Sequence, residues 1–373
     1  MTTVAPEVRP VPAPPAIAGI DHLEWWVGNA RAFTGFLESA FGFDVVAYAG
    51  PETGRRDRVS YLLQQGRVRF VVTGALAPDS PIAEHVRRHG DGIRDVCFVV
   101  DDVPGAFAAA VDRGAEPAEE PTTESDAAGT VHRAAIRVYG ETVHTFLDRS
   151  HHTGELGPGF EPTDLVRPVG PPVGLGHIDH VVANVEQGRL EDWVRFYEQV
   201  LGFDQLTHFD DSQISTEYSA LMSTVVWNHD GVVLPINEPA EGRRKSQIEE
   251  YLDFYGGPGV QHIALHTSDI VSTVQALRER GVRFMDVPTE YYDDARRRLE
   301  GVDLDWEALA ALGILVDRDH AGHLLQIFTE TVTDRPTVFF EIIERRGAQG
   351  FGEGNFKALF ESIERAQARR GNL

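Results

Sequence analysis

The chain has 373 residues, 42% of them hydrophobic, and its 58 acidic and 34 basic side chains give a net charge of −24. This length allows a large core and two domains, and the scattered basic residues offer no stripe for a phosphate backbone, so we expect no nucleic-acid partner. No apolar run reaches about 18 residues, which argues against a membrane partner, and a single cysteine, Cys97, excludes an intramolecular disulfide and a thiolate metal site.

The N-terminal stretch, residues 1–18, is rich in Pro and Ala and is expected to be a disordered lead-in. It lacks the basic start and the continuous apolar run of a secretory signal peptide. Together with the dispersed acidic side chains, this composition indicates a cytoplasmic protein.

Two long stretches of the chain are repeated. GIDHLEWWVGNARAFTGFLESAFGFD at 19–44 matches HIDHVVANVEQGRLEDWVRFYEQVLGFD at 177–204. Each contains the triplet Ile-Asp-His, a strand-like run, an amphipathic helix and a Gly-Phe-Asp stop. In a second pair, 90–117 and 257–284, a strand leads into an acidic helix start and a helix that ends at Gly. Such repetition indicates a protein built from copies of one unit.

The segments between these repeats complete the unit. Short apolar runs with turn residues, at 58–74 and 223–239, are typical of β-hairpins. The unit is therefore β-α-β-β-β, used four times, and it predicts an α+β fold with two barrel domains of two units each. We place the N-terminal domain at 19–150, a linker rich in Pro and Gly at 151–175, and the C-terminal domain at 176–373.

The C-terminal half carries three residues that could bind a metal. His180 and His262 occupy equivalent positions in two strand openings, and Glu341 lies inside the apolar run PTVFFEIIER. A carboxylate in such a run needs a partner, because an isolated buried charge is costly. Two imidazoles and one carboxylate form the facial triad of non-haem iron(II) sites, which leaves positions open for substrate and oxygen.

The N-terminal half supplies an internal comparison. Its residues at the equivalent positions are His22, Asp95 and Thr145, so one of the three ligands is present. We therefore expect this domain to keep the fold without binding a metal, and we interpret His22 as an ordinary core residue.

Four further histidines are expected outside the metal site. His177 lies on the strand face opposite to that of His180 and is expected at the surface or behind the metal ligands. His151 and His152 fall in the linker and are expected to be solvated. His266 shares the strand face of His262 but lies at the end of the strand.

Several motifs resemble the 4-hydroxyphenylpyruvate dioxygenase family. They are IDHVVANV, LPINEPA, KSQIEEYLDFYGGPGVQHIAL, LLQIFTETVTDRPTVFFEIIERRGAQGFGEGNFKALFESIE and the terminal RGNL. The resemblance covers nearly the whole chain from residue 19 and is densest from residue 176 onward. This family belongs to the vicinal-oxygen-chelate superfamily, whose barrels are built from paired βαβββ units.

The resemblance implies an iron(II)-dependent oxidoreductase, a dioxygenase of tyrosine and phenylalanine catabolism. Fe(2+) would be held by His180, His262 and Glu341. The substrates 4-hydroxyphenylpyruvate and O2 would give homogentisate and CO2, and the substrate would supply the 2-oxo acid that chelates the iron. We also expect a homo-oligomer.

The family's substrate pocket maps onto amides, one hydroxyl and several aromatic rings of this chain. A phenol ring fits flat apolar walls, and its hydroxyl group fits a few fixed amides. Without the resemblance, each Phe could equally be ordinary core. Gln261 has strand parity opposite to that of His262, so a direct contact from Gln261 is the least expected of the set. The catalytic residues implied are Gln247, Gln326 and Phe339. The substrate-binding residues implied are Ser223, Asn237, Gln247, Gln261, Gln326, Phe328, Phe339, Phe351 and Phe356.

The C-terminal segment GEGNFKALFESIERAQARR predicts an amphipathic helix with Asn355 as its N-cap. The preceding GFGEG offers a hinge, because glycine gives the backbone wide freedom. In the functional interpretation, this helix is a lid whose Phe351 and Phe356 side chains close the pocket and exclude water. The alternative is a helix packed permanently on the barrel. Residues 293–313 receive no assignment.

Two other functions compete with the dioxygenase. 4-Hydroxymandelate synthase has the same fold, iron and substrate but hydroxylates the benzylic carbon; the motif PINEP and Phe339 beside the metal strand favour the dioxygenase. The second alternative is a metal-free small-molecule-binding protein of the same fold, against which the complete set of three ligands argues.

Overall fold

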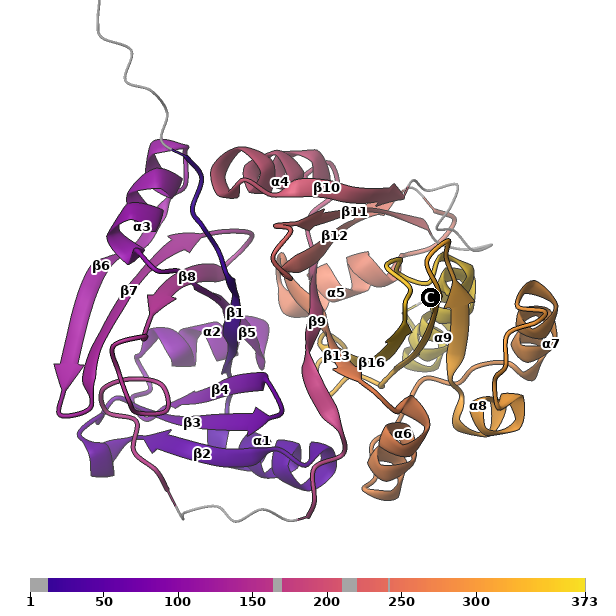
Figure 1. Ribbon diagram of the computed structural model, residues 1–373, viewed down its shortest axis with the longest axis horizontal. Coiled ribbons are helices and arrows are strands. Elements are labelled where there is room, and N and C mark those ends of the chain that lie inside the picture. The colour runs from indigo at the N-terminus through magenta and orange to yellow at the C-terminus, as the bar shows by residue number, and fades with distance from the viewer. Residues whose placement is uncertain (1–12, 164–169, 210–219, 241, 373) are drawn as a thin grey trace, which may run out of the picture.

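The computed structural model describes residues 13–163, 170–209, 220–240 and 242–372. The two halves of the chain form two eight-stranded sheets that lie next to each other (Figure 1). The strand order is β2-β3-β4-β1-β5-β8-β7-β6 in the first sheet and β10-β11-β12-β9-β13-β16-β15-β14 in the second. Subtracting eight from the second set of labels gives the first, which confirms the duplicated α+β fold predicted from the repeat.

The N-terminal sheet consists of β1 (Gly19–Trp26), β2 (Asp44–Ala49), β3 (Arg58–Gln65), β4 (Val68–Ala75), β5 (Gly92–Val99), β6 (Pro117–Asp126), β7 (Gly129–Arg137) and β8 (Val143–Asp148). Its helices are α1 (Ala30–Phe36), α2 (Pro81–His89) and α3 (Val103–Asp112). Each half of this sheet is one βαβββ unit, and α2 connects the two units.

The C-terminal sheet consists of β9 (Leu175–Asn184), β10 (Asp204–Phe209), β11 (Ala220–Trp227), β12 (Val233–Ala240), β13 (Gly259–Thr267), β14 (Leu315–Arg318), β15 (His323–Phe328) and β16 (Phe339–Arg346). Its helices are α4 (Leu190–Phe196), α5 (Gln247–Tyr255), α6 (Ile270–Glu279), α7 (Thr289–Arg298), α8 (Trp306–Leu312) and α9 (Glu353–Arg370). The unassigned stretch 293–313 thus contains the end of α7 and all of α8, inserted before β14.

The first helix of each half ends in the same way. After α1 and after α4 the chain makes a π-helical turn, over Leu37–Phe41 and Tyr197–Leu201. Gly42 and Gly202 then stop both helices with φ angles of 73° and 74°. Such positive φ angles favour glycine, which explains why both copies of the repeat carry Gly-Phe-Asp at this point.

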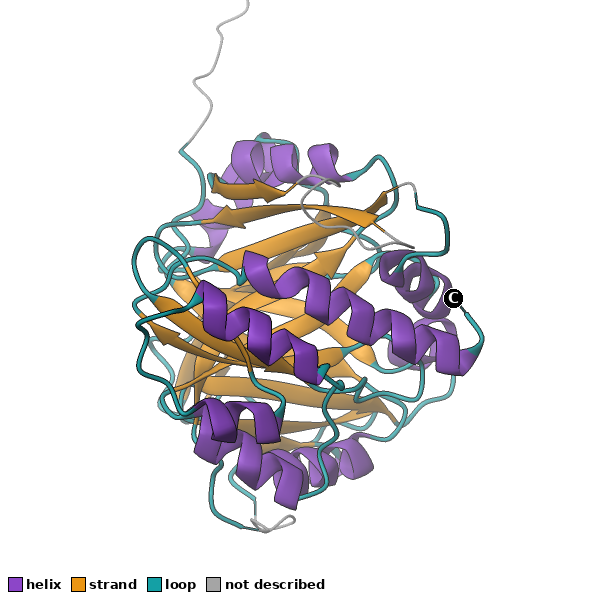
Figure 2. Ribbon diagram, turned by 90° about the vertical axis from the view of Figure 1, so that its right-hand side faces the viewer, coloured by secondary structure: helices purple, strands orange, loops and turns teal. Residues whose placement is uncertain are grey.

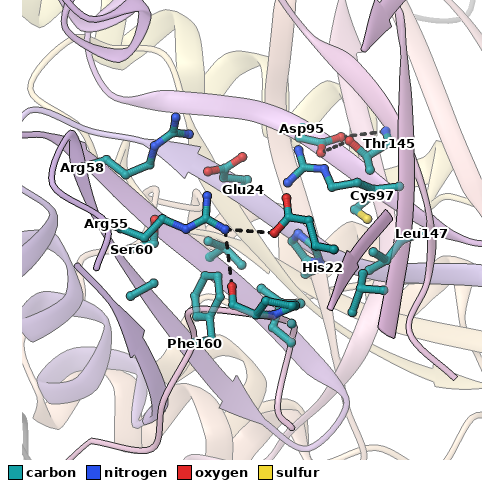
Figure 3. Close-up of a pocket in the computed structure, with 18 residues that line it drawn as sticks. His22, Glu24, Arg55, Arg58, Ser60, Asp95, Cys97, Thr145, Leu147 and Phe160 are labelled. Carbon is teal, nitrogen blue, oxygen red and sulfur yellow. Dashed lines mark hydrogen bonds and ion pairs between the residues drawn. The ribbon is translucent and has the colours of Figure 1, made fainter. Parts of the chain in front are cut away.

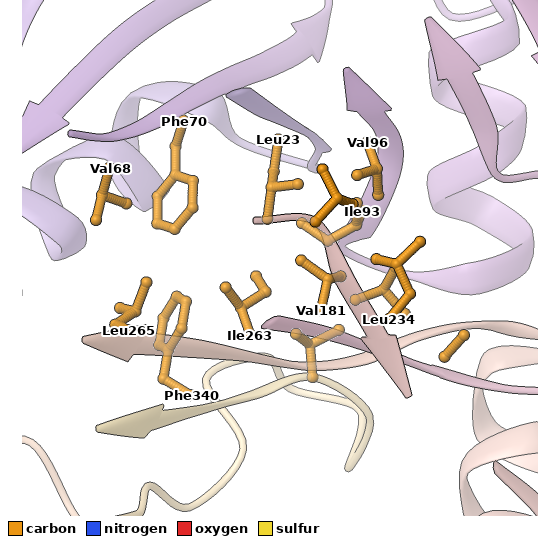
Figure 4. Close-up of a cluster of buried hydrophobic side chains, with 14 of the residues drawn as sticks. Leu23, Val68, Phe70, Ile93, Val96, Val181, Leu234, Ile263, Leu265 and Phe340 are labelled. Carbon is orange, nitrogen blue, oxygen red and sulfur yellow. The ribbon is translucent and has the colours of Figure 1, made fainter. Parts of the chain in front are cut away.

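The main core lies between the two sheets, where apolar side chains from both halves face each other (Figure 4). Phe70 on β4 and Phe340 on β16 stack with ring centroids 6.0 Å apart, and Trp25 on β1 lies 6.0 Å from Phe340. Phe340 therefore points into the shared core, whereas its neighbours Phe339 and Glu341 point to the other face of β16.

Figure 2 shows helices in front of the strands and at both ends of the molecule. None of the helices in the described part of the chain is both long and apolar enough to cross a bilayer. Each sheet keeps two edge strands, β2 and β6 in the first and β10 and β14 in the second, so the predicted barrels are open half-barrels.

Two segments expected outside the fold are partly buried. The expected lead-in includes Ile17, which is buried and whose carbonyl accepts a hydrogen bond from Asn228. In the expected linker, His152 is buried, not solvated, and its ring pairs with Asp126. His151 is exposed, as expected. Residues 1–12 of the lead-in and 164–169 of the linker lie outside the described residues.

Candidate active site

Three adjacent strands of the C-terminal sheet bring the expected ligands together. His180 lies on β9, His262 on β13 and Glu341 on β16. Ala264 on the central strand is the register partner of both His180 and Glu341. Because the methyl group of Ala264 is small, the two longer side chains can meet above it, and His262, two residues before Ala264, reaches the same point.

The ligand atoms of these three side chains converge on one oxygen of Glu341. Its Oε2 lies 3.2 Å from Nε2 of His180 and 3.5 Å from Nε2 of His262. All three side chains are buried, and their ligand atoms lie within 4.8 Å of one another. One carboxylate and two imidazole nitrogens around a common point form a donor set that fits a divalent metal ion.

Neighbouring side chains fix the orientation of both imidazoles. Nδ1 of His180 donates to Oδ1 of Asp179 at 2.8 Å, and Nδ1 of His262 donates to Oε1 of Gln261 at 3.0 Å. Because these acceptors occupy both Nδ1 atoms, each Nε2 can present a lone pair to a metal. Asp179 is held in turn by Arg345.

The charges of the cluster are strongly coupled. Burial opposes ionisation of Glu341, but the charge of His180 and the hydrogen bonds from both imidazoles lower the pKa of Glu341 overall. Burial also disfavours the charged form of His262 and so lowers its pKa. For His180, burial acts in the same direction, but the charge of Glu341 and the hydrogen bond to Asp179 outweigh it and raise the pKa to about 9. The cluster therefore attracts one positive charge, either a proton or a cation.

A pocket of about 610 Å³ opens above the three ligands. Every substrate-binding residue implied by the family resemblance lines it: Ser223, Asn237, Gln247, Gln261, Gln326, Phe328, Phe339, Phe351 and Phe356. Gln261, the least expected of these, lines the pocket and also orients His262. A register shift between Val260 and His262 in the pairing with β9 interrupts the simple alternation on which the parity argument rested.

Seven further lining residues were missing from the expected set. Six of them lie two residues along a strand, or one helical turn, from an expected residue and so share its face. The seven are Val182, Phe209, Leu221, Val225, Pro235, Leu359 and Phe360. Phe209 is the exception, because it ends β10 and is recognisable through its edge-to-face contact with Phe356 at 5.2 Å.

Aromatic rings surround the metal-binding side of the pocket. Phe339 stacks on the ring of His262 at 4.8 Å, and Phe328 meets His262 edge to face at 6.0 Å. Phe351 meets His180 edge to face at 5.4 Å. These rings form flat apolar walls that exclude water from both imidazoles.

The pocket also contains amides with unused hydrogen-bonding capacity. Oε1 of Gln326 is buried and has no hydrogen-bond partner among the described residues. Nδ2 of Asn237 reaches Oδ1 of Asn184 at 3.4 Å, and Nδ2 of Asn184 has no partner in the described part of the chain. Buried polar groups of this kind are usually satisfied, so a polar ligand group is the natural partner for Gln326.

Helix α9 closes one side of the pocket with Phe356, Leu359 and Phe360. It begins after Gly352, which has φ 77°, and not after Asn355, so the predicted N-cap is wrong. Asn355 lies inside the first turn, where its Oδ1 accepts a hydrogen bond from Tyr291. A Cβ on Gly352 would lie 2.7 Å from Nε2 of Gln326, so the absence of a side chain allows the helix start to approach that amide.

The remaining histidines lie outside the pocket lining. His177 and His266 stack on each other with centroids 4.4 Å apart and are partly buried. Their strand ends lie away from the three ligands, so neither histidine joins the candidate metal centre.

A second cavity, of about 830 Å³, occupies the equivalent place in the N-terminal half (Figure 3). Its lining includes the equivalent residues His22, Asp95 and Thr145. Thr145 donates to both oxygens of Asp95, through its hydroxyl at 2.5 Å and its amide at 3.0 Å. Burial raises the pKa of Asp95 to about 6. Among the described residues this cavity has no group of three side chains that could share an ion.

Charged side chains replace the aromatic and amide lining in this second cavity. Arg133 pairs with Leu147, two residues after Thr145, as Gln326 pairs with Ile343, two residues after Glu341. Arg133 therefore stands where the C-terminal half has Gln326. Glu24, Arg55 and Arg58 also line the cavity (Figure 3). His22 thus borders a charged cavity, although it is as buried as a core residue.

The comparisons with known proteins agree with one another on the family. The model of the glyoxalase/bleomycin resistance protein/dioxygenase superfamily matches residues 19–156 and 177–327. A 4-hydroxyphenylpyruvate dioxygenase from Yarrowia lipolytica is 46% identical over 368 residues, covering 95% of this chain and 93% of that protein. One from Dictyostelium discoideum is 47% identical over 365 residues, covering 95% of this chain and 100% of that protein.

Among solved structures, a triply substituted 4-hydroxymandelate synthase from Streptomyces coelicolor is similar over both domains. The TM-score is 0.85 at 36% sequence identity, with 94% of this chain and 99% of that chain covered. This chain and the synthase therefore share the duplicated fold, whereas the sequence identity is higher to the dioxygenases.

Proposed function

Because the chain belongs to the 4-hydroxyphenylpyruvate dioxygenase family, we propose that it converts 4-hydroxyphenylpyruvate and O2 to homogentisate and CO2. The observation that carries this assignment is the convergence of His180, His262 and Glu341 at the base of a pocket with aromatic walls. The proposed pathway role is tyrosine and phenylalanine catabolism.

The metal of this site is, in our proposal, iron(II). The donor set of two imidazoles and one carboxylate is that of non-haem iron oxygenases and leaves coordination positions for other ligands. The hydrogen bonds of both Nδ1 atoms support it, because they direct each Nε2 toward the same point. When bound, iron(II) supplies the activation of O2 that the protein's own side chains cannot provide.

The pocket suggests how the substrate is oriented. The 2-oxo acid end fits beside the three ligands, where a bound divalent metal would supply the positive charge that attracts it. Phe328 and Phe339, which contact each other at 6.2 Å, offer faces for the phenol ring. Gln247 and Gln326 offer amides for polar groups of the substrate, and the unpartnered Oε1 of Gln326 supports a hydrogen bond from a ligand.

Helix α9 is, in this proposal, the lid of the pocket. Phe351 and Phe356 lie where they would separate the reacting groups from water. The far end of the helix is fastened, since Arg370 and Asn372 both bond Glu250 on α5. Any opening would therefore occur at the glycines around Gly352, while the last turn stays in place.

The competing activity is that of 4-hydroxymandelate synthase. The similar solved structure favours it as the alternative, since enzymes of both kinds share the duplicated fold. The higher identity to dioxygenases, 46–47% against 36%, favours homogentisate as the product. A metal-free binding protein is a poorer match, because three buried ligand atoms aimed at one point form a donor set suited to a metal ion.

Identification of the reaction product tests the proposal. Iron-loaded protein is incubated with 4-hydroxyphenylpyruvate and O2, and the products are separated by chromatography beside homogentisate and 4-hydroxymandelate standards. We propose further that the protein is a cytoplasmic homo-oligomer, which light scattering and cell fractionation would test.

A further inference from the structure

A second group of three potential ligands lies in the N-terminal half, for which the sequence predicted no metal, next to its junction with the C-terminal half and outside both cavities. His85 and His89 are one turn apart on α2, and Glu141 lies in the turn between β7 and β8. In the described ranges, this group and the candidate active site are the two places where three such ligand atoms come within 4.8 Å of one another.

We propose that His85, His89 and Glu141 bind a structural divalent metal ion, for which zinc is the best match. Two imidazoles and one carboxylate suit zinc, and a water molecule would complete a four-coordinate site. The ion would join α2 to the turn between β7 and β8, next to the contact of α2 with α5 of the C-terminal half (Figure 1).

The distances within the group support an ion. Oε2 of Glu141 lies 3.1 Å from Nδ1 of His85 and 3.4 Å from Nε2 of His89. The corresponding pair of distances in the candidate active site is 3.2 Å and 3.5 Å. Ligand atoms bound to one tetrahedral zinc ion are about 3.4 Å apart, given bond lengths of about 2.0–2.2 Å. Both groups therefore have the spacing that a shared ion requires.

The tautomer of His89 supplies the second argument. Its Nδ1 lies 2.6 Å from the carbonyl oxygen of Tyr255, which can only accept a hydrogen bond, so Nδ1 carries the proton. In the tautomer with its proton on Nδ1, the ring has a lone pair on Nε2, which lies 3.4 Å from Oε2 of Glu141. Nε2 is buried and has no hydrogen-bond partner among the described residues. Two acceptors that face each other repel, and a cation between them removes the conflict.

The surrounding side chains hold the three ligands in place. Tyr255 stacks on His89 with centroids 4.6 Å apart, and Trp26 meets His85 edge to face at 5.3 Å. Arg88 contacts Oε1 of Glu141, which leaves Oε2 directed at the histidines. Of the two rings, that of His89 has the hydrogen bond from its second nitrogen that is characteristic of metal ligands. Nε2 of His85 has no such partner among the described residues.

The position of the site suggests what the ion would do. Tyr255 is the last residue of α5, and Gln247, the first residue of α5, lines the substrate pocket. Arg335 fixes the same junction, because it donates to the carbonyl groups of Arg88 and Phe254. An ion on α2 would stabilise the contact between the halves without touching the reacting groups.

Cobalt(II) binding to a variant with a disabled active site tests the proposal. Glu341→Ala removes the shared ligand of the active site, so the variant should bind one equivalent of cobalt(II), with a visible d–d spectrum typical of nitrogen and oxygen ligands. Zinc should displace the cobalt and abolish the spectrum. Wild-type protein should bind two equivalents of zinc, measured by competition with a chromophoric chelator.

Matched variants in the Glu341→Ala background locate the ion. His89→Ala should abolish the spectrum, and Glu141→Gln should weaken binding by more than about 100-fold, the upper end for removal of an outer-shell partner alone. His151→Ala alters an exposed histidine and should change neither result. Because Glu141 is partly exposed, Glu141→Gln keeps the test decisive if His89→Ala fails to fold. Absence of cobalt from Glu341→Ala, or equal binding by Glu141→Gln, would overturn the proposal and leave His89 as an imidazolium paired with Glu141.

Discussion

Arg345 donates two hydrogen bonds to Asp179, from Nε to Oδ2 and from Nη2 to Oδ1, each 2.8 Å long. Asp179 in turn accepts from Nδ1 of His180. The N-terminal half has the same chain of contacts, from Arg149 to Asp21 at 2.7 Å and from His22 to Asp21 at 2.8 Å. Both halves therefore support a histidine in the same way. The C-terminal half adds the candidate ligands His262 and Glu341, where the N-terminal half has Asp95 and Thr145.

Replacement of Arg345 tests whether this support matters for the metal. Arg345→Met should weaken iron(II) binding by about 10–100-fold, the usual effect of removing an outer-shell partner, because Asp179 would no longer hold His180 in place. The measurement is a competition titration with a chelator. Arg149→Met makes the equivalent change in the other half and should leave iron affinity unchanged. Equal losses in both variants would show a general effect on stability.

Removal of a candidate ligand should show a larger difference between the two halves than removal of its supporting arginine. His180→Ala, His262→Ala and Glu341→Ala should each abolish turnover and iron binding at the active site. His22→Ala should keep both, although it removes a buried side chain and should lower the melting temperature. Iron content by mass spectrometry and turnover by oxygen consumption measure the outcome. Loss of iron from His22→Ala with retention in His180→Ala would reverse our assignment of the halves.

The sequence was sufficient to predict which three side chains converge, because duplication acted as a control. His180 and His262 occupy equivalent repeat positions, and the structure brings both to Glu341. Strand parity failed for Gln261, where a register shift changes the alternation. The N-cap failed because Gly352, with a positive φ, starts α9 before Asn355. Phe209 was missed because its contact with Phe356 joins segments far apart in the chain, which local periodicity does not report.

Gly352 and Gly371 form a matched pair at the two ends of α9. Both have φ 77°, so alanine should cost about 1–2 kcal/mol of stability at either position. A Cβ at Gly352 would meet Gln326, whereas one at Gly371 would meet nothing within 4 Å. Gly352→Ala should therefore lower turnover while iron stays bound, and Gly371→Ala should not. Similar turnover in both variants would show that the approach to Gln326 is not needed for catalysis.

The lid proposal makes a prediction about coupling. Phe356→Ala should keep iron bound, because the three ligands lie upstream, but it should admit water to the pocket. Oxygen consumption should then exceed homogentisate formation, measured side by side with an oxygen electrode and by chromatography. Deletion of residues 352–373 should have the same effect in stronger form. Full coupling in Phe356→Ala would indicate that α9 only packs against the barrel.

Metal exchange tests the oxidative chemistry. Chelation should leave a folded but inactive protein, because apolar side chains such as Phe70 and Phe340 form the described core between the sheets. Iron(II) should restore turnover, and zinc should occupy the active site without restoring it, since zinc has no redox chemistry. Circular dichroism and oxygen consumption follow folding and activity. Turnover with zinc alone would exclude an iron-dependent oxygenase.

The most direct test of the central claim is the identity and amount of the product formed by iron-loaded protein from 4-hydroxyphenylpyruvate and O2. Our account predicts homogentisate, with one CO2 released and one O2 consumed for each molecule. This outcome would link the ligands on β9, β13 and β16 and the aromatic walls around them to ring hydroxylation. A product that is mainly 4-hydroxymandelate, or unchanged substrate in the presence of bound iron, would contradict it.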